Sequence, residues 1–163
     1  RDGAALLTAL ENLWPSYLSY AISFLAIGGY WLAHHRMFRG IAHYDRRLLA
    51  LNLLLLMSIA FIPFPTTVLS HSGSAVATIF YAATMTVTGL VSALIWGHAS
   101  ARGRLLAHKL TSREYRRGWL RMLAAPAIFA LSIPLALVNS DLARLSWLLI
   151  AGSLTIQAHI ETP

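Results

Sequence analysis

The chain has 163 residues, of which 57% are apolar and only 12% are charged, and its mean hydropathy is +0.61. Soluble domains carry about one quarter charged residues, so this composition indicates a membrane protein. There is no cysteine, which excludes disulfides, thiolate metal sites and cysteine nucleophiles.

Five apolar segments are each long enough to cross a bilayer core, which takes about 20 helical residues. We therefore expect an all-α, polytopic transmembrane helix bundle, with five spanning helices in a single integral membrane domain. The first four segments carry no charge, whereas the fifth contains Arg144, whose head can reach the interface while its stem stays buried. The predicted spans are residues 13–33, 48–70, 74–97, 122–140 and 142–158.

The first span ends in the stretch YWLAHHRMF, residues 30–38. In one interpretation this is an interfacial belt, with Tyr30 and Trp31 at headgroup depth and imidazole groups near the carbonyl end of the helix dipole. In the other, His34 or His35 faces the bundle and pairs with a polar group on another helix. Adjacent histidines point about 100° apart on a helix, so we expect no shared metal site.

The second span is interrupted by Asn52, early in its apolar run. An unpaired amide is costly in lipid, so Asn52 should pair with another helix; we favour this structural contact over a direct role in a transport path. Pro63 and Pro65 are expected to bend or end the helix, with Thr66 able to satisfy a freed carbonyl.

The third span carries a stripe of small and hydroxyl-bearing residues at spacings of three and four. Such stripes are typical of close helix packing in membranes, and contact with water or ions is the alternative. The residues are Ala77, Tyr81, Thr84, Thr88 and Ser92.

Eleven of the thirteen basic residues lie in two alternate linkers. The positive-inside rule places these linkers, and with them the carboxyl terminus, in the cytoplasm. Attraction of the linkers to anionic lipid accounts for the net charge of +7 without nucleic acid as a partner. Five crossings would leave the amino end outside, so parity predicts one more helix before Arg1. The basic residues are Arg36, Arg39, Arg46, Arg47, Arg102, Arg104, Lys109, Arg113, Arg116, Arg117 and Arg121.

The sequence contains no phosphate-binding glycine loop, GxSxG, HExxH or paired carboxylate motif, and its six acidic residues lie in linkers or termini. We therefore expect no enzyme, cofactor or metal. The sequence contains no internal repeat, which is the feature that would suggest a secondary transporter.

The order of these features resembles the transmembrane protein 175 family of potassium channels, over about residues 13–147. The most specific parts are the Trp-x-x-His pattern of Trp31 and His34, the Leu-Asn-Leu pattern around Asn52, and Pro63 shortly after it.

This resemblance implies a subunit of a potassium channel in a bacterial plasma membrane, of the prokaryotic single-repeat type that assembles as a homotetramer. Members have six helices per repeat and conduct potassium, and in lysosomal members protons, through an apolar constriction. The chain would hold helices two to six, because nothing in it matches the first, pore-lining helix with its Arg-x-x-x-Phe-Ser-Asp signature. By resemblance, His34, Trp31 and Asn52 form a polar network that braces that signature. The alternative function is a non-conducting membrane scaffold or accessory subunit.

Overall fold

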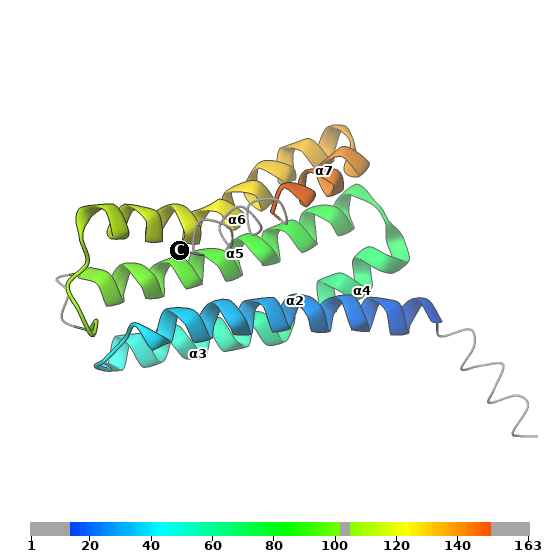
Figure 1. Cartoon of the computed structure of the whole chain (residues 1–163). Coiled ribbons are helices and arrows are strands. Elements are labelled where there is room, and N and C mark those ends of the chain that lie inside the picture. The colour runs from blue at the N-terminus through cyan, green and yellow to red at the C-terminus, as the bar shows by residue number, and fades with distance from the viewer. Residues whose placement is uncertain (1–13, 102–104, 151–163) are drawn as a thin grey trace, which may run out of the picture.

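The computed structural model describes residues 14–101 and 105–150, and this part of the chain is a bundle of α-helices (Figure 1). The predicted all-α bundle is therefore confirmed. The helices are α2 (Trp14–Arg39), α3 (Arg46–Phe61), α4 (Pro63–Ser72), α5 (Ala75–Ser100), α6 (Ser112–Val138) and α7 (Ser140–Ser146).

Helix α5 lies at the centre of the bundle and contacts α3, α4, α6 and α7. Helices α2, α3 and α4 lie on one side of it, and α6 and α7 on the other (Figure 1). The predicted packing stripe of α5 lies within these contacts, because Ala77 and Thr88 are buried and its other members are half-buried. The hydroxyls of Thr84, Thr88 and Ser92 each donate to the carbonyl four residues earlier, so none needs a partner on another helix.

Three helical stretches of the described residues are long and apolar enough to cross a membrane: Arg46–Ser72, Ala75–Ser100 and Ser112–Val138. They overlap the second, third and fourth predicted spans. The first predicted span begins at residue 13, outside the described part, and its residues 14–33 lie in α2, which has 26 residues but does not reach the same hydropathy. The fifth begins in α7 and continues into residues 151–158, outside the described part. The count of five spans therefore stays a prediction.

The second predicted span is interrupted at Ile62, where α3 ends and α4 begins. Pro63 has no N–H to continue the helical ladder, and the Ile62 amide instead bonds the Ile59 carbonyl at 3.1 Å in a tighter turn. The Thr66 hydroxyl donates to the Ile62 carbonyl at 2.9 Å. The expected proline break is confirmed. The Ile62 carbonyl also accepts from the Thr66 amide at 3.2 Å, so the Thr66 hydroxyl does not satisfy a carbonyl that a proline leaves free.

Helices α5 and α6 pack unusually closely, because glycines of each helix face a large side chain of the other. A Cβ atom at any of these glycines would lie 3.0 Å or less from the opposing side chain. Only glycine leaves room for such an approach. The pairs are Gly89 with Pro126, Gly97 with Trp119, and Gly118 with Trp96.

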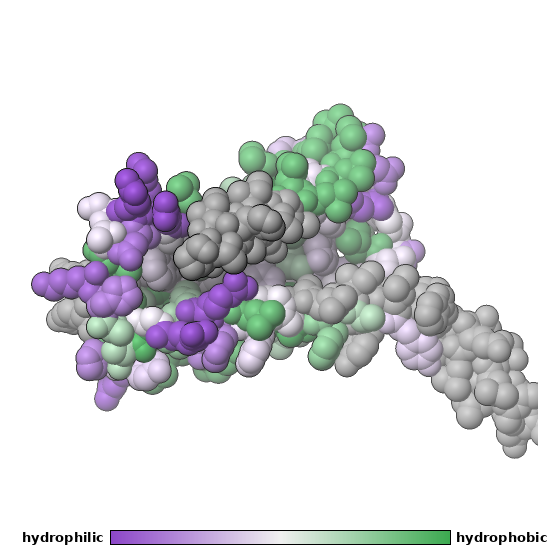
Figure 2. Space-filling view, in the orientation of Figure 1, coloured by the Kyte–Doolittle hydropathy of each residue, from purple (hydrophilic) through white to green (hydrophobic). Residues whose placement is uncertain are grey.

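One end of the bundle, here called the basic end, holds two linkers, residues 40–45 and the described residues 101 and 105–111 between α5 and α6, with the helix ends beside them. Figure 2 shows hydrophilic side chains gathered over this end. The linkers are joined by backbone hydrogen bonds: the Ala42 amide donates to the Leu105 carbonyl at 2.8 Å, and the Ala107 amide donates to the Gly40 carbonyl at 3.0 Å. The two linkers whose flanking helix ends carry most of the positive charge are thus held together.

Candidate functional site

The polar pair predicted to link helices forms between α2 and α3. His34 Nε2 lies 2.6 Å from Asn52 Oδ1, and both side chains are half-buried. Because Oδ1 can only accept, Nε2 carries the proton and donates. The prediction that Asn52 pairs with another helix is confirmed. His34 was expected to have its partner on a helix outside this sequence, and the structure also gives it a partner on α3.

The other rings of YWLAHHRMF are divided between two faces of α2. Trp31 stacks on His35, with ring centroids 5.4 Å apart, and both are exposed. His34 stacks on Phe38, with centroids 4.1 Å apart. The structure thus brings together His34 and Asn52, and it does not bring Trp31 to them. That Trp31 belongs to one network with the other two stays a prediction.

Tyr30 lies deeper in the bundle than an interfacial ring would. It is half-buried, and its hydroxyl is 3.8 Å from the sulfur of Met85 on α5. A tyrosine one turn before a polar end is the usual mark of a headgroup belt, so sequence reasoning had no signal for this contact.

A contact that sequence reasoning missed joins the carboxyl end of α5 to the residue before α3. The Asp45 carboxylate lies 2.8 Å and 3.0 Å from His98 Nε2, and its Oδ1 also accepts from the Leu48 amide at 2.7 Å as the N-cap of α3. The Leu48 amide, and after it the ring of His98, holds the pKa of Asp45 below its ordinary value. Asp45 just before an apolar run is a recognisable N-cap, but its pairing with His98 depends on the fold.

Replacing Asp45 with asparagine should lower stability at neutral pH and have no effect in acid. Asparagine still caps the helix but cannot carry charge. A lowered folded-state pKa stabilises the native state fully above the ordinary carboxyl value of 3.8, and the stabilisation is lost as pH falls through the lower folded value. Thermal unfolding of both proteins in detergent should show melting temperatures that differ at pH 7 and converge in acid. A difference independent of pH would contradict the assignment.

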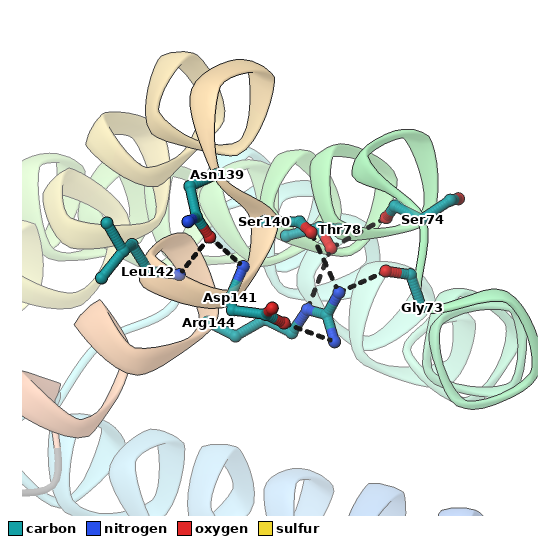
Figure 3. A network of polar contacts seen from close by, with 8 residues as sticks. All are labelled: Gly73, Ser74, Thr78, Asn139, Ser140, Asp141, Leu142 and Arg144. Atoms are coloured by element: carbon teal, nitrogen blue, oxygen red, sulfur yellow. Dashed lines mark hydrogen bonds and ion pairs between the residues drawn. The ribbon is translucent and has the colours of Figure 1, made fainter.

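At the opposite end of the bundle, Arg144 of α7 joins α7 to the turn between α4 and α5 (Figure 3). Its guanidinium donates to the Gly73 carbonyl, to the Thr78 hydroxyl at 3.3 Å and to the Ser140 hydroxyl at 3.3 Å. Gly73 caps α4 in the left-handed region, with φ +56°, which favours glycine. We expected this arginine to extend toward the interface, and the structure directs it to a helix carboxyl end.

Replacing Arg144 with methionine should destabilise the protein by about 1 to 3 kcal/mol, because the Gly73 carbonyl and the Thr78 hydroxyl lose a charged donor while the apolar stem is kept. The unfolding free energy measures the loss. Asp141→Ala is the matched control: its carboxylate is 81% exposed and 3.6 Å from the guanidinium, an ion pair worth about 0 to 1 kcal/mol. Equal losses in both variants would show that the ion pair, and not the helix cap, is what matters.

Within residues 14–101 and 105–150 there is no group of three or more histidine and carboxylate side chains that could hold a metal ion.

Comparisons with known proteins all find potassium channels as the similar proteins. The family model described as endosomal/lysosomal potassium channel TMEM175 matches residues 2–63. The chain is 34% identical over 139 residues to a protein of Streptomyces collinus named as a potassium channel, covering 82% of this chain and 68% of that protein. It is 33% identical over 142 residues to a protein of Chamaesiphon minutus with the same description, covering 85% and 70%.

A solved structure has the same fold. It is the crystal structure of a lysosomal potassium-selective channel TMEM175 homolog from Chamaesiphon minutus, with a TM-score of 0.73 and 26% identity over 96% of this chain and 80% of that one. The sequence identity over most of both relatives, together with this fold, shows that the chain belongs to the TMEM175 family of potassium channels.

Proposed function

We propose that this chain is a subunit of an oligomeric channel that conducts potassium ions across a bacterial plasma membrane. The observation that carries the proposal is its identity of 34% and 33% to two proteins named as potassium channels, over more than two thirds of each. The apolar helices support an integral membrane protein.

The proposed topology has five spans, with the basic end in the cytoplasm. Support comes from the fold, which gathers the two charged linkers at one end of the bundle and joins them by backbone hydrogen bonds. Eleven of thirteen basic residues belong to these linkers and their flanking helix ends. The single basic residue of the opposite end that the structure describes, Arg144, is accounted for by its cap on α4.

The proposed role of His34, Trp31 and Asn52 is to brace the pore-lining helix that members of the family place first. One face of α2 suits such a neighbour, because its rings Tyr17, Phe24 and Trp31 are exposed and recur every seven residues. Seven residues are close to two helical turns, so the three rings form one row.

Two glycines of α2 support a close neighbour for this helix. Apart from the adjacent residues and the nearby backbone of α2 itself, no atom of the described chain lies within 4 Å of the place a Cβ would take at Gly28 or Gly29. Glycine inside a helix costs about 1 kcal/mol relative to alanine, and nothing in this part of the protein requires it. Contact between membrane helices is the usual reason for such glycines.

Flux through proteoliposomes tests the proposal. The protein would be expressed from its coding sequence together with any upstream segment that encodes an apolar helix with Phe-Ser-Asp, and its oligomer mass measured in detergent. We expect a tetramer and a flux of potassium well above that of sodium. A folded protein that passes neither ion would instead favour the non-conducting scaffold, and an upstream reading frame without such a helix would remove the bracing role.

A further inference from the structure

The basic end contains a cavity of about 380 Å³ that the proposed channel function does not use. It lies where α5 ends and α6 begins, with the linker between them. Its wall combines two leucines with one amine and four hydroxyl groups. The lining residues are Ser100, Leu106, Lys109, Leu110, Thr111, Ser112 and Tyr115.

Two of the four hydroxyls are already used within the chain. The Ser100 hydroxyl donates to the Trp96 carbonyl at 2.7 Å. Thr111 caps α6, with its hydroxyl 2.8 Å from the Glu114 carboxylate and 3.2 Å from the Glu114 amide. Lys109, Ser112 and Tyr115 have no such partner in the described part of the chain. The cavity therefore presents one ammonium group and two hydroxyls that can still donate.

The charge around the cavity is strongly positive. Arg113, Arg116 and Arg117 are exposed on the first turns of α6. The acidic side chain nearest in sequence, Glu114, accepts from both the amide and the hydroxyl of Thr111 and keeps its single negative charge, which is outnumbered by the four cations Lys109, Arg113, Arg116 and Arg117. A lysine and hydroxyl donors in a positive field favour a phosphate group over a neutral or cationic ligand.

The apolar part of the wall adds a second requirement. Leu106 and Leu110 line the cavity together with the donors. Tyr115 meets Trp119 edge to face, with ring centroids 6.4 Å apart, an aromatic pair typical of headgroup depth. A free anion would leave the leucine side without a contact, whereas a phospholipid brings both a phosphate and the start of an acyl chain.

We propose that this cavity binds the phosphate group of an anionic membrane lipid, with Lys109 as its charged contact and the Ser112 and Tyr115 hydroxyls as further donors. The inference rests on the proposed function in one respect, the position of the basic end at the membrane surface. Leu106 also forms an antiparallel β-bridge with Ile41, in the linker that follows α2. Backbone pairing therefore links the wall of the cavity to the end of the helix that carries His34.

Native mass spectrometry of the full protein in detergent tests the site, with phosphatidylglycerol as probe and phosphatidylcholine as neutral reference. Lys109→Gln should weaken retention of phosphatidylglycerol about tenfold. Tyr115→Phe should weaken it about threefold. Arg116→Gln is the matched control, because it removes the same charge from the same surface but does not line the cavity.

The outcomes separate clearly. Loss confined to the Lys109 and Tyr115 variants supports the site, while equal losses in the Arg116 variant overturn it in favour of diffuse attraction. Displacement of the lipid by inorganic phosphate at equal concentration overturns the lipid as the source of the anion. Since binding is measured without ion flux, a protein that retains the lipid but conducts no potassium leaves this site standing and removes the channel proposal. Equal melting temperatures of all variants would verify their folding.

Discussion

Alanine at position 34 is expected to weaken both the fold and the channel. It removes the 2.6 Å hydrogen bond to Asn52 and leaves the amide oxygen half-buried in an apolar span without a donor. Hydrogen bonds between membrane helices contribute about 0.6 to 2 kcal/mol, and the unpaired amide adds to the cost. We expect a loss of about 1 to 2 kcal/mol in unfolding free energy. If the proposed tetramer is weakened by a similar amount, the proposed potassium flux at fixed protein concentration should fall about tenfold.

The neighbouring residue provides the control for this experiment. His35→Ala removes an identical side chain, but one that is exposed and contacts only Trp31 among the ring pairs. We expect it to change unfolding free energy by less than about 0.5 kcal/mol. The double variant of His34→Ala with Asn52→Leu should lose less than the sum of the single variants, since the second change removes the unpaired amide. Additive losses would show that the two side chains do not support one another.

Replacing Gly118 with alanine should be among the most destabilising single substitutions in the bundle. Its Cβ would lie 2.8 Å from the indole nitrogen of Trp96, and closer still to two ring carbons. The ring must move within the α5–α6 contact, and overpacking of this kind costs about 1 to 3 kcal/mol. Thermal unfolding in detergent would measure it. Gly40→Ala is the matched control, because the nearest atom to its Cβ is 3.6 Å away, an ordinary contact.

A second substitution tests whether the clash itself is responsible. The Trp96 indole nitrogen is buried and has no hydrogen-bond partner in the described structure. Trp96→Phe removes that donor and shortens the ring, so it should recover part of the stability lost in Gly118→Ala. If Trp96→Phe makes the Gly118 variant less stable still, the close approach of the ring is not the cause.

The sequence predicts the apolar helices, the pairing of Asn52 and the break near Pro63, because each follows from a local physical cost. An amide in lipid must find a partner, and a proline cannot continue a helical ladder. These rules hold wherever the neighbouring helix lies. They do not say which helix supplies the partner. The family resemblance groups His34 with Asn52, and their direct hydrogen bond is established once α2 and α3 are placed side by side.

The contacts that escaped prediction all join residues far apart in the chain. Asp45 and His98 are 53 residues apart, and Arg144 and Gly73 are 71 apart. Each of these residues alone has an ordinary local explanation, as an N-cap, a helix-end basic residue, an interfacial arginine or a turn glycine. Gly118 is similar, since a single glycine near the start of a helix gives no sign that a tryptophan ring from another helix lies against it.

The paired glycines of α5 and α6 have a mechanical consequence. A slide or rotation of one helix against the other would bring a side chain to the place of a glycine, where an indole or a proline leaves no room. We therefore expect the two helices to move together. A change of shape in the subunit is then expected outside the α5–α6 pair. The interruption between α3 and α4 at Ile62, where a helical hydrogen bond is already missing, is the natural hinge for α4.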